Sequence, residues 1–202
     1  QLLKVSFLGQ GSVLLFGGAF EDQIFDDTWI FNLNQKSWKQ IKSSKVPEKR
    51  ALHSMAQLKE AKALLFGGST GSLSIEECGW IFDQNKNEWN KLSLIGECGI
   101  DSLPSARYLQ RMASVGDGKL LMTGGRGSEH LLLPQTWLFA LNDHSNDSCS
   151  WKRLDGGLPS TKTPDERSHH AVASIGVGKF LLFGGTNDKQ SLMQDTWIYD
   201  QI

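Results

Sequence analysis

Residues 13–18 of this chain read Val-Leu-Leu-Phe-Gly-Gly, a short apolar run that ends on two glycines. The pattern recurs as Ala-Leu-Leu-Phe-Gly-Gly at 63–68, as Leu-Leu-Met-Thr-Gly-Gly at 120–125 and as Phe-Leu-Leu-Phe-Gly-Gly at 180–185. Self-similarity at a spacing of roughly 50 to 60 residues is the signature of a repeat architecture. The sequence therefore predicts a repeat protein in which each Gly-Gly pair occupies an equivalent place.

Each repeat has the pattern of four short strands. In the first, the run at 13–16 is apolar at successive positions, as in a strand that is covered on both faces. The segment at 28–33 is rich in β-forming residues, and the segment at 37–41 alternates like a half-exposed outer strand. The units span residues of about 1–50, 51–107, 108–167 and 168–202, and the last one lacks its fourth strand.

Two tryptophan positions and one Pro-x-x-Arg motif recur in phase with the Gly-Gly pairs. The pairs are Gly17 and Gly18, Gly67 and Gly68, Gly124 and Gly125, and Gly184 and Gly185. The recurring residues are Trp29, Trp80, Trp137 and Trp197, then Trp38, Trp89 and Trp151, then a Pro-x-x-Arg ending at Arg50, Arg107 and Arg167. Over nearly the whole chain this pattern resembles the Kelch repeat. The resemblance implies an all-β propeller of four-stranded antiparallel blades.

The number of repeats indicates an incomplete ring. About three and three-quarter blades are present, whereas propellers close with about 4 to 8 blades, and the resemblance implies rings of about six. Apolar sheet faces would be left open at both ends. We therefore expect a part of a larger propeller, completed by further sequence, by another chain or by a second copy.

Function is expected on the loops that follow each Gly-Gly pair. Because the sheets are antiparallel, these loops (19–27, 69–78, 126–135 and 186–194) share one face with the connections between units (42–49, 93–106 and 155–166). Long loops on a rigid scaffold tend to carry function, and in Kelch-like proteins this face is the usual partner-binding face. The charged candidates for partner contact are Glu21, Asp22, Lys45, Arg126, Glu129, His130, Asp188 and Lys189.

Other conspicuous residues are interpreted as structural. The recurring arginines are expected to tie adjacent units by hydrogen bonds to carbonyl groups, and the tryptophans to pack between blades. His169 and His170 are adjacent on a strand, so they point to opposite faces and cannot chelate a metal together. Cys78 and Cys98 could form a disulfide or stay as two thiols, and Cys149 has no catalytic motif around it. Asn146 begins a glycosylation sequon.

Composition disfavours several partner classes. The formal net charge is -1, and no apolar run approaches the ~18 residues of a membrane span. The basic residues between Lys36 and Arg50 form a modest basic edge. Because the chain as a whole is slightly acidic, direct nucleic-acid binding is a minority hypothesis. The chain lacks an initiating Met, which suggests a processed or excised piece. As the location of the protein, the cytoplasm or nucleus is slightly favoured.

The leading hypothesis is a non-catalytic scaffold that binds a protein or peptide partner and needs no cofactor. One alternative is an accessory propeller subunit of a nucleic-acid-processing or other enzyme complex. Another is a metal-dependent Kelch-type enzyme, since some propellers with this repeat hold copper through Tyr and His or depend on iron. Tyr108 and Tyr199 are the two tyrosines in the chain, and no convincing metal set accompanies them.

Overall fold

Four antiparallel sheets follow one another along the chain. The computed structural model describes residues 4–71, 79–92, 103–141, 149–155 and 163–200. Blade 1 contains β1 (Lys4–Gly9), β2 (Ser12–Phe20), β3 (Gln23–Asn32) and β4 (Ser37–Ile41). Blade 2 contains β5 (Ser54–Lys59), β6 (Lys62–Phe66), β7 (Trp80–Asp83) and β8 (Glu88–Lys91). Blade 3 contains β9 (Arg111–Gly116), β10 (Lys119–Thr123), β11 (Thr136–Leu141) and β12 (Cys149–Arg153). Blade 4 contains β13 (Ala171–Gly176), β14 (Lys179–Phe183) and β15 (Thr196–Asp200).

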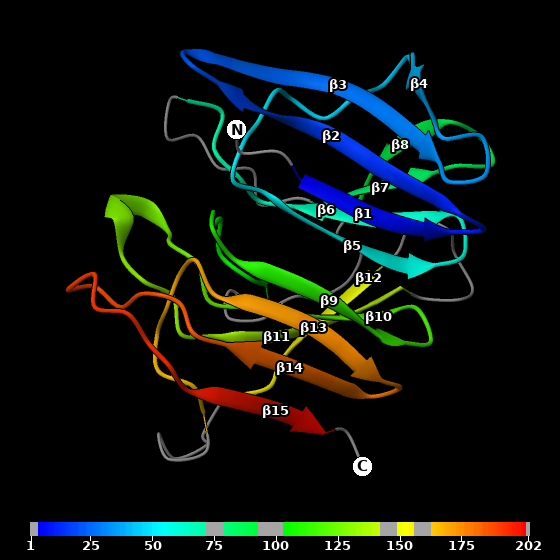
Figure 1. Ribbon diagram of the computed structural model, residues 1–202. Coiled ribbons are helices and arrows are strands. Elements are labelled where there is room, and N and C mark those ends of the chain that lie inside the picture. Colours follow the sequence, from blue (N-terminus) through cyan, green and yellow to red (C-terminus); the bar gives the residue numbers. More distant parts are fainter. Residues whose placement is uncertain (1–3, 72–78, 93–102, 142–148, 156–162, 201–202) are drawn as a thin grey trace.

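The first strand of each sheet is the innermost one. Within every sheet the strands pair in sequence order, and β1 packs against β5, β5 against β9, and β9 against β13 (Figure 1). This is the arrangement of blades in a β-propeller. The predicted all-β propeller with four-stranded antiparallel blades is therefore confirmed, and so is the absence of a fourth strand from the last blade in the described residues.

The cores lie between blades, and this explains the apolar runs. Along β2, Leu14 and Phe16 face blade 2 and are fully buried against Leu65 and Phe82. The neighbouring Leu64 in β6 points the other way, into the next cluster with residues of blade 3. A blade that is packed on both faces needs apolar side chains at successive positions rather than at alternate ones. A third, smaller cluster joins blades 3 and 4.

The seven tryptophans do not share one environment. Trp80, Trp89, Trp137 and Trp151 are buried between blades, whereas Trp29 and Trp197 are half-buried. Trp38 is 48% exposed although it repeats the position of Trp89, which is 1% exposed. Within the described residues Trp38 packs against no neighbouring blade, so for Trp38 the expectation of packing between blades stays a prediction. Its side of blade 1 faces away from blade 2, so no described blade covers it.

Both ends of the row of blades present apolar faces. Val5, Phe7 and Trp38 are exposed on blade 1, and Phe183 and Ile198 are exposed on blade 4. Except for Phe7, these residues are equivalent by repeat position to ones that are buried inside the row, such as Met55 for Val5 and Phe66 for Phe183. That a larger ring covers them stays a prediction.

The loop predicted at 19–27 is wrong. β2 and β3 continue as a hairpin beyond the Gly-Gly pair, with Ala19 opposite Ile24 and Phe20 opposite Gln23. Gly17 and Gly18 form an irregularity in this ladder instead of ending it. The apolar residues on both sides of the turn favour continued pairing. Glu21 and Asp22 therefore form the tip of a long hairpin, at the upper left of Figure 1.

Among the described residues, no helix has the length and apolar character needed to cross a membrane.

Candidate functional site

The recurring arginines join neighbouring blades at the start of each unit. The main-chain oxygens of Arg50, Arg107 and Arg167 accept hydrogen bonds of 2.9 Å from the amides of Gly18, Gly68 and Gly125 in the preceding blade. Their Nη1 atoms donate to the carbonyl oxygens of Gly67, Gly124 and Gly184 at 3.1, 3.2 and 3.0 Å. All three side chains are buried. These guanidinium groups are therefore committed to the scaffold and do not face a ligand.

The residues that follow each arginine turn toward the inside of the ring. Leu109 and His169 both adopt left-handed backbone conformations, with φ of 59° and 60°. Isolated bridges pair Tyr108 with Arg126 and Ser168 with Thr186, next to the Gly-Gly pairs of blades 3 and 4. This local geometry places two short segments beside the two loops where function was expected.

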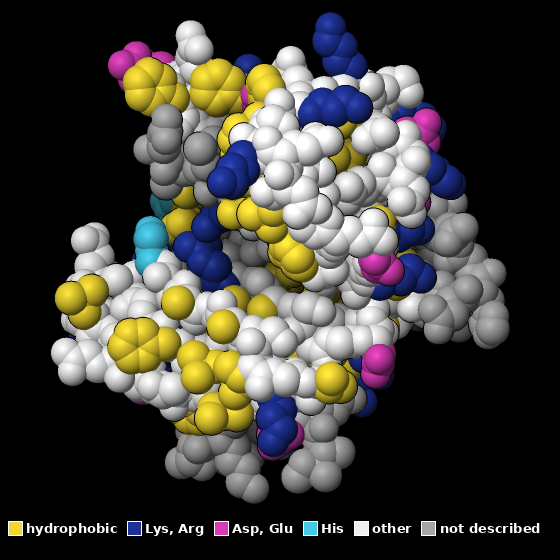
Figure 2. All heavy atoms as spheres, turned by 45° about the vertical axis from the view of Figure 1, so that its right-hand side comes forward, with side chains coloured by type: hydrophobic (Ala, Val, Ile, Leu, Met, Phe, Trp, Pro, Cys, Tyr) yellow, Lys and Arg dark blue, Asp and Glu magenta, His cyan; other side chains and the backbone are white. Residues whose placement is uncertain are grey.

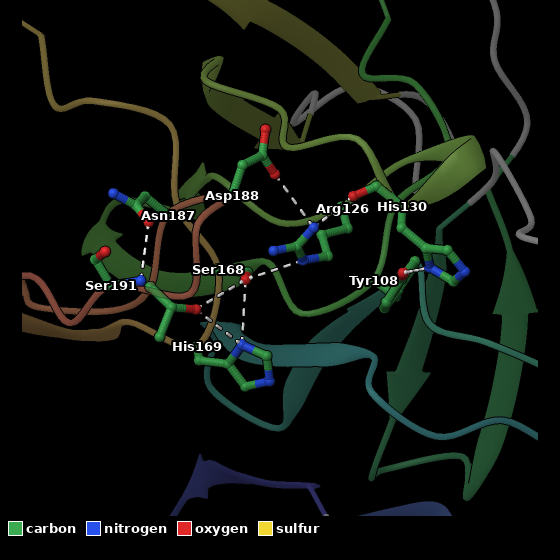
Figure 3. A network of polar contacts seen from close by, with 9 residues as sticks. Tyr108, Arg126, His130, Ser168, His169, Asn187, Asp188 and Ser191 are labelled. Carbon is green, nitrogen blue, oxygen red and sulfur yellow. Dashed lines mark hydrogen bonds and ion pairs between the residues drawn. The ribbon is translucent and has the colours of Figure 1, made fainter.

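A hollow of about 670 Å³ lies between these segments and loops. It is lined by Tyr108, Leu109, Arg126, His130, His169, Thr186, Asp188 and Gln190. Figure 3 shows the polar side chains around it, which come from blades 3 and 4. We call this site the blade 3–4 hollow. The face of the molecule on which it opens carries the loops after the Gly-Gly pairs, and we call it the Gly-Gly loop face.

Arg126 is the central cation of the hollow. Its Nη1 donates to the main-chain oxygen of His130 at 2.5 Å and lies 3.3 Å from Asp188 Oδ1. Its Nε donates to Ser168 Oγ at 3.3 Å. The guanidinium thus bridges the loop of blade 3 to the loop of blade 4, which holds both loops in one relative position.

Tyr108 and His130 form the side of the hollow that belongs to blade 3. The Tyr108 hydroxyl hydrogen-bonds to His130 Nδ1, and the two rings meet edge to face. Burial raises the pKa of Tyr108, and the nearby Arg126 opposes this rise. The phenol therefore keeps its proton at neutral pH and offers a neutral polar group.

Further cations lie close to His169. Burial lowers the pKa of His169, and Arg111, Arg126 and Lys4 lower it further, so the ring is neutral at pH 7. Burial and Arg111 lower the pKa of Lys4 to about 8, and burial lowers the pKa of Arg111. Figure 2 shows Lys and Arg side chains together with a His side chain in the recess at the left of the molecule. Cationic side chains therefore act on His169 in addition to Arg126.

Three exposed apolar side chains lie on the segments that follow Gly-Gly pairs. Phe20 lies beside the tip of the β2–β3 hairpin, Leu131 follows the 3-10 turn η1 (Ser128–His130), and Leu192 lies in the loop of blade 4. Each follows a Gly-Gly pair, so all three lie on the Gly-Gly loop face. The face combines a polar hollow with exposed apolar side chains, which is typical of a surface that binds another chain.

The structure brings together three of the eight candidate contact residues, namely Arg126, His130 and Asp188. Glu129 and Lys189 are exposed on the same two loops, Glu21 and Asp22 at the hairpin tip, and Lys45 between blades 1 and 2. Sequence reasoning missed His169 as a site residue, because it lies just before the inner strand β13 rather than in a long loop. Tyr108, considered there only as an enzyme residue, follows a recurring arginine directly, and this was the available signal.

The other residues singled out in the sequence do not line the blade 3–4 hollow. His170 is buried while His169 lines the hollow, so the adjacent rings do point apart. Within the described ranges, no group of three or more His, Cys, Asp or Glu side chains could hold a metal. Tyr199 is half-buried and packs at the contact of blades 3 and 4, and Cys149 is buried. Cys78, Cys98 and Asn146 lie outside the described residues.

Comparison with known families agrees with this geometry. Residues 4–116 and 62–201 match the model of the KLHDC2/KLHL20/DRC7 Kelch-repeats domain. The chain belongs to the Kelch-repeat family. Kelch-repeat homologues suggest a protein-interaction propeller.

Several curated proteins are similar to this Kelch-repeat chain. Adagio-like protein 3 from Oryza sativa subsp. japonica is 26% identical over 90% of the chain, and an F-box/kelch-repeat protein from Arabidopsis thaliana is 27% identical over 98%. Kelch domain-containing protein 1 from Mus musculus is 27% identical over 84%. The matched segments make up 29%, 41% and 40% of these relatives, so the Kelch-repeat chain spans well under half of their length.

Proposed function

We propose that this Kelch-repeat chain is a non-catalytic interaction module that binds a protein or peptide partner on its Gly-Gly loop face. The observation that carries the proposal is the blade 3–4 hollow, where Arg126 holds two loops together beside exposed apolar side chains. A polar hollow on a face with exposed apolar side chains offers both orientation and buried area to a bound segment.

The contact groups come from three loops of different blades. The hairpin tip with Glu21 and Asp22, the loop with Glu129 and His130, and the loop with Asp188 and Lys189 all follow Gly-Gly pairs. Because the Arg–Gly links join the blades rigidly, these loops have little freedom to rearrange. A partner therefore binds to a preorganised surface, and this lowers the entropic cost of binding.

The proposal is tested by affinity capture from lysate with two variants. Arg126→Glu together with His130→Ala alters the hollow, whereas Lys86→Glu alters an exposed turn between β7 and β8 on the opposite face. A specific partner is expected to bind wild type and Lys86→Glu but not the hollow variant. A partner that is lost only with Lys86→Glu would place binding on the other face and refute the proposal.

The exposed faces of blades 1 and 4 pack against further blades of the same kind. Inside the row, Phe16 meets Trp89 and Phe66 meets Trp151 edge to face, with ring centroids 5.1 and 5.2 Å apart. By repeat position, Phe183 and Trp38 are the two halves of one such contact. The row therefore ends in two complementary surfaces.

This complementarity is tested by light scattering on the 202-residue chain. A second copy serves as the source of the further blades, so the chain is expected to self-associate in a concentration-dependent manner. Trp38→Glu or Phe183→Glu is expected to yield monomers. A wild-type chain that stays monomeric at high concentration would contradict complementary end faces.

A further inference from the structure

A small pocket lies beside the outer strand of blade 4, at the contact with blade 3. Its volume is about 100 Å³ and its wall is mostly apolar. The wall includes Thr123 and Thr136 from blade 3, and Trp197 and Tyr199 from β15 of blade 4. Among the described strands β15 pairs with β14 alone, and it lies at the bottom of Figure 1 with its other edge uncovered by any of them. We call this pocket the β15 socket.

The same place between other blades is filled by a tryptophan. Trp89 contacts Phe16 of the preceding blade and Phe82 of its own blade, with ring centroids 5.1 Å apart in both pairs. Trp151 makes the two equivalent contacts at the next junction, at 5.2 and 5.0 Å. Each tryptophan comes from the fourth strand of its blade, β8 or β12. Blade 4 has no such strand among the described residues.

Three residues of the β15 socket occupy the repeat positions that surround Trp89 in the filled junction. The correspondences are Tyr199 for Phe82, Thr123 for Phe16 and Thr136 for Thr28. Thr28 Oγ1 accepts the indole hydrogen bond of Trp89, at 3.0 Å. A hydroxyl has two acceptor lone pairs, so Thr136 can accept an indole N–H while it contacts the Thr123 hydroxyl at 3.3 Å. The socket therefore offers the ring contact and the acceptor that an indole requires.

We propose that the β15 socket binds a tryptophan side chain from an extended segment of another polypeptide, which adds to blade 4 as a strand antiparallel to β15. The site and the kind of contact differ from those proposed for the Gly-Gly loop face, so this binding is a further function. An exposed strand edge supplies main-chain hydrogen bonds, and a pocket beside it selects the side chain. A tryptophan carries both the large apolar surface and the single N–H donor that this pocket can use.

A basic residue two positions after the tryptophan completes the preferred sequence of the partner. In blade 2 this residue is Lys91, which lies opposite Trp80 in the ladder, with its ammonium group 5.9 Å from the ring centroid. Trp197 is the equivalent ring of blade 4 and lines the socket. A strand that sets its tryptophan opposite Tyr199 brings the second residue after it opposite Trp197. A cation is favoured there by the face of the indole ring.

A separate partner fits the socket better than a second copy of this chain. Trp89 and Trp151 are buried inside the row of blades. Trp38 is exposed on the edge strand β4, but the second residue after it is the uncharged Gln40. Trp38 is also the residue that the proposed contact of complementary end faces sets against Phe183. A segment with Trp-x-Lys or Trp-x-Arg on another polypeptide meets neither obstacle.

Fluorescence anisotropy with a labelled peptide tests the proposal. The peptide has the sequence of residues 86–92, Lys-Asn-Glu-Trp-Asn-Lys-Leu. It is expected to bind the 202-residue chain saturably, and at least about tenfold more tightly than the same peptide with Trp89→Ala. N-acetyltryptophanamide is also expected to bind at least about tenfold more weakly, because it cannot pair with β15. Equal binding by the alanine peptide or by N-acetyltryptophanamide would overturn the proposal.

Variants of the chain locate the peptide in the socket. Thr136→Val removes the acceptor of the indole N–H at nearly unchanged shape and is expected to weaken binding about threefold. Tyr199→Ala removes the ring that the tryptophan packs on and is expected to weaken binding at least about tenfold. Thr196→Val, at an exposed position on the other face of β15, is the matched control and is expected to bind like wild type. Equal binding by all four proteins would place the peptide elsewhere and refute the socket.

Amide hydrogen exchange separates strand addition from insertion of the ring alone. The main-chain amides of β15 are expected to exchange at least about tenfold more slowly with the peptide bound. Unchanged exchange in β15 at saturation would refute strand addition.

Two further outcomes assign the occupant. Dissociation of a self-associated chain by the peptide, as expected for Trp38→Glu, would mean that β4 of a second copy occupies the socket, and would refute a separate partner. Arg126→Glu with His130→Ala is expected to leave peptide binding unchanged. Failure of the peptide to bind would therefore refute this inference and leave the function proposed for the Gly-Gly loop face standing.

Discussion

A β-carbon on Gly67 would lie 2.2 Å from the carbonyl oxygen of Arg107, which belongs to the next blade. The equivalent separations are 2.7 Å for Gly17 and Arg50, and 2.5 Å for Gly124 and Arg167. The same carbonyl accepts the hydrogen bond of the following glycine amide. Glycine is thus required where neighbouring blades approach through their main chains.

Gly67→Ala is expected to destabilise the protein strongly. The new methyl group must displace main-chain atoms of the next blade, and φ at this position is 66°, so a loss of at least about 2 kcal/mol is expected. Urea unfolding measures it. Gly118→Ala is the control, since its φ is 69° but nothing lies within 4 Å of the added carbon. Equal losses for the two variants would show that backbone strain, and not the close approach, accounts for the effect.

Trp89 and Trp38 are expected to differ sharply when truncated. Trp89 is buried between Phe16 and Phe82, and its indole Nε1 donates to Thr28 Oγ1 at 3.0 Å. Trp89→Ala is therefore expected to cost about 3–5 kcal/mol. The exposed Trp38 contacts Phe31, and in the monomeric chain Trp38→Ala is expected to cost less than about 1 kcal/mol. Similar losses in thermal unfolding would mean that Trp38 is covered in the protein in solution.

Two buried histidines are expected to make the blade contacts sensitive to acid. Burial lowers the pKa of both His53 and His170 to about 3. Their folded-state pKa lies below the unfolded value of about 6.5, so the unfolded chain binds more protons below that pH. Stability is then complete above pH 6.5 and falls toward pH 3, by up to about 1.4 kcal/mol per pH unit for each histidine.

The third repeat indicates which substitution tests this effect of acid. Gln110 occupies the equivalent position and donates to the Phe66 oxygen at 2.7 Å. His53→Gln with His170→Gln is therefore expected to flatten the loss of stability between pH 6.5 and 4, whereas His130→Gln, at an exposed position, is not. Identical pH profiles of urea unfolding for wild type and the double variant would contradict buried neutral histidines.

Asp195 is expected to stabilise blade 4 only when ionised. Both of its oxygens accept hydrogen bonds from Arg167, at 2.6 and 2.7 Å, and this holds its pKa at about 2. The folded-state pKa is below the unfolded value, so this stabilisation is present above about pH 4 and is lost as the pH falls toward 2. Asp195→Asn should lower the melting temperature at pH 7 and have little effect near pH 2.

Asp117→Asn is the control for this series, because Asp117 is exposed in the turn between β9 and β10. It is expected to leave the melting temperature unchanged at both pH values. If the gap between wild type and Asp195→Asn stays constant down to pH 2, the Arg167 contact does not depend on the charge of Asp195.

The fold could be predicted from the sequence because the same contacts are made repeatedly. Four Gly-Gly pairs in phase with Trp and Arg indicate strand order and blade number without any long-range information. The β2–β3 hairpin was missed because glycines usually end a strand, whereas here Gly17 and Gly18 form a bulge within a longer ladder. Residue type alone could not reveal the continued pairing.

The site was only partly predictable. Arg126, His130 and Asp188 lie in long polar loops and were candidates for that reason, although nothing local indicated that they meet. Lys4 and Arg111 begin innermost strands, where a charged residue is usually solvated. Their convergence on His169 depends on the curvature of the whole row of blades, and no sequence window contains that information.

The sequential packing of β1, β5, β9 and β13 also bears on how the molecule comes apart. Cooperativity in such an array passes from neighbour to neighbour, as in a one-dimensional chain of coupled units. Within the described residues, blades 2 and 3 are flanked on both sides, whereas blade 4 has three strands and one neighbour. In the monomeric chain, amide hydrogen exchange should therefore be slowest in β6 and β10 and fastest in β14, with opening that begins at the ends and spreads inward.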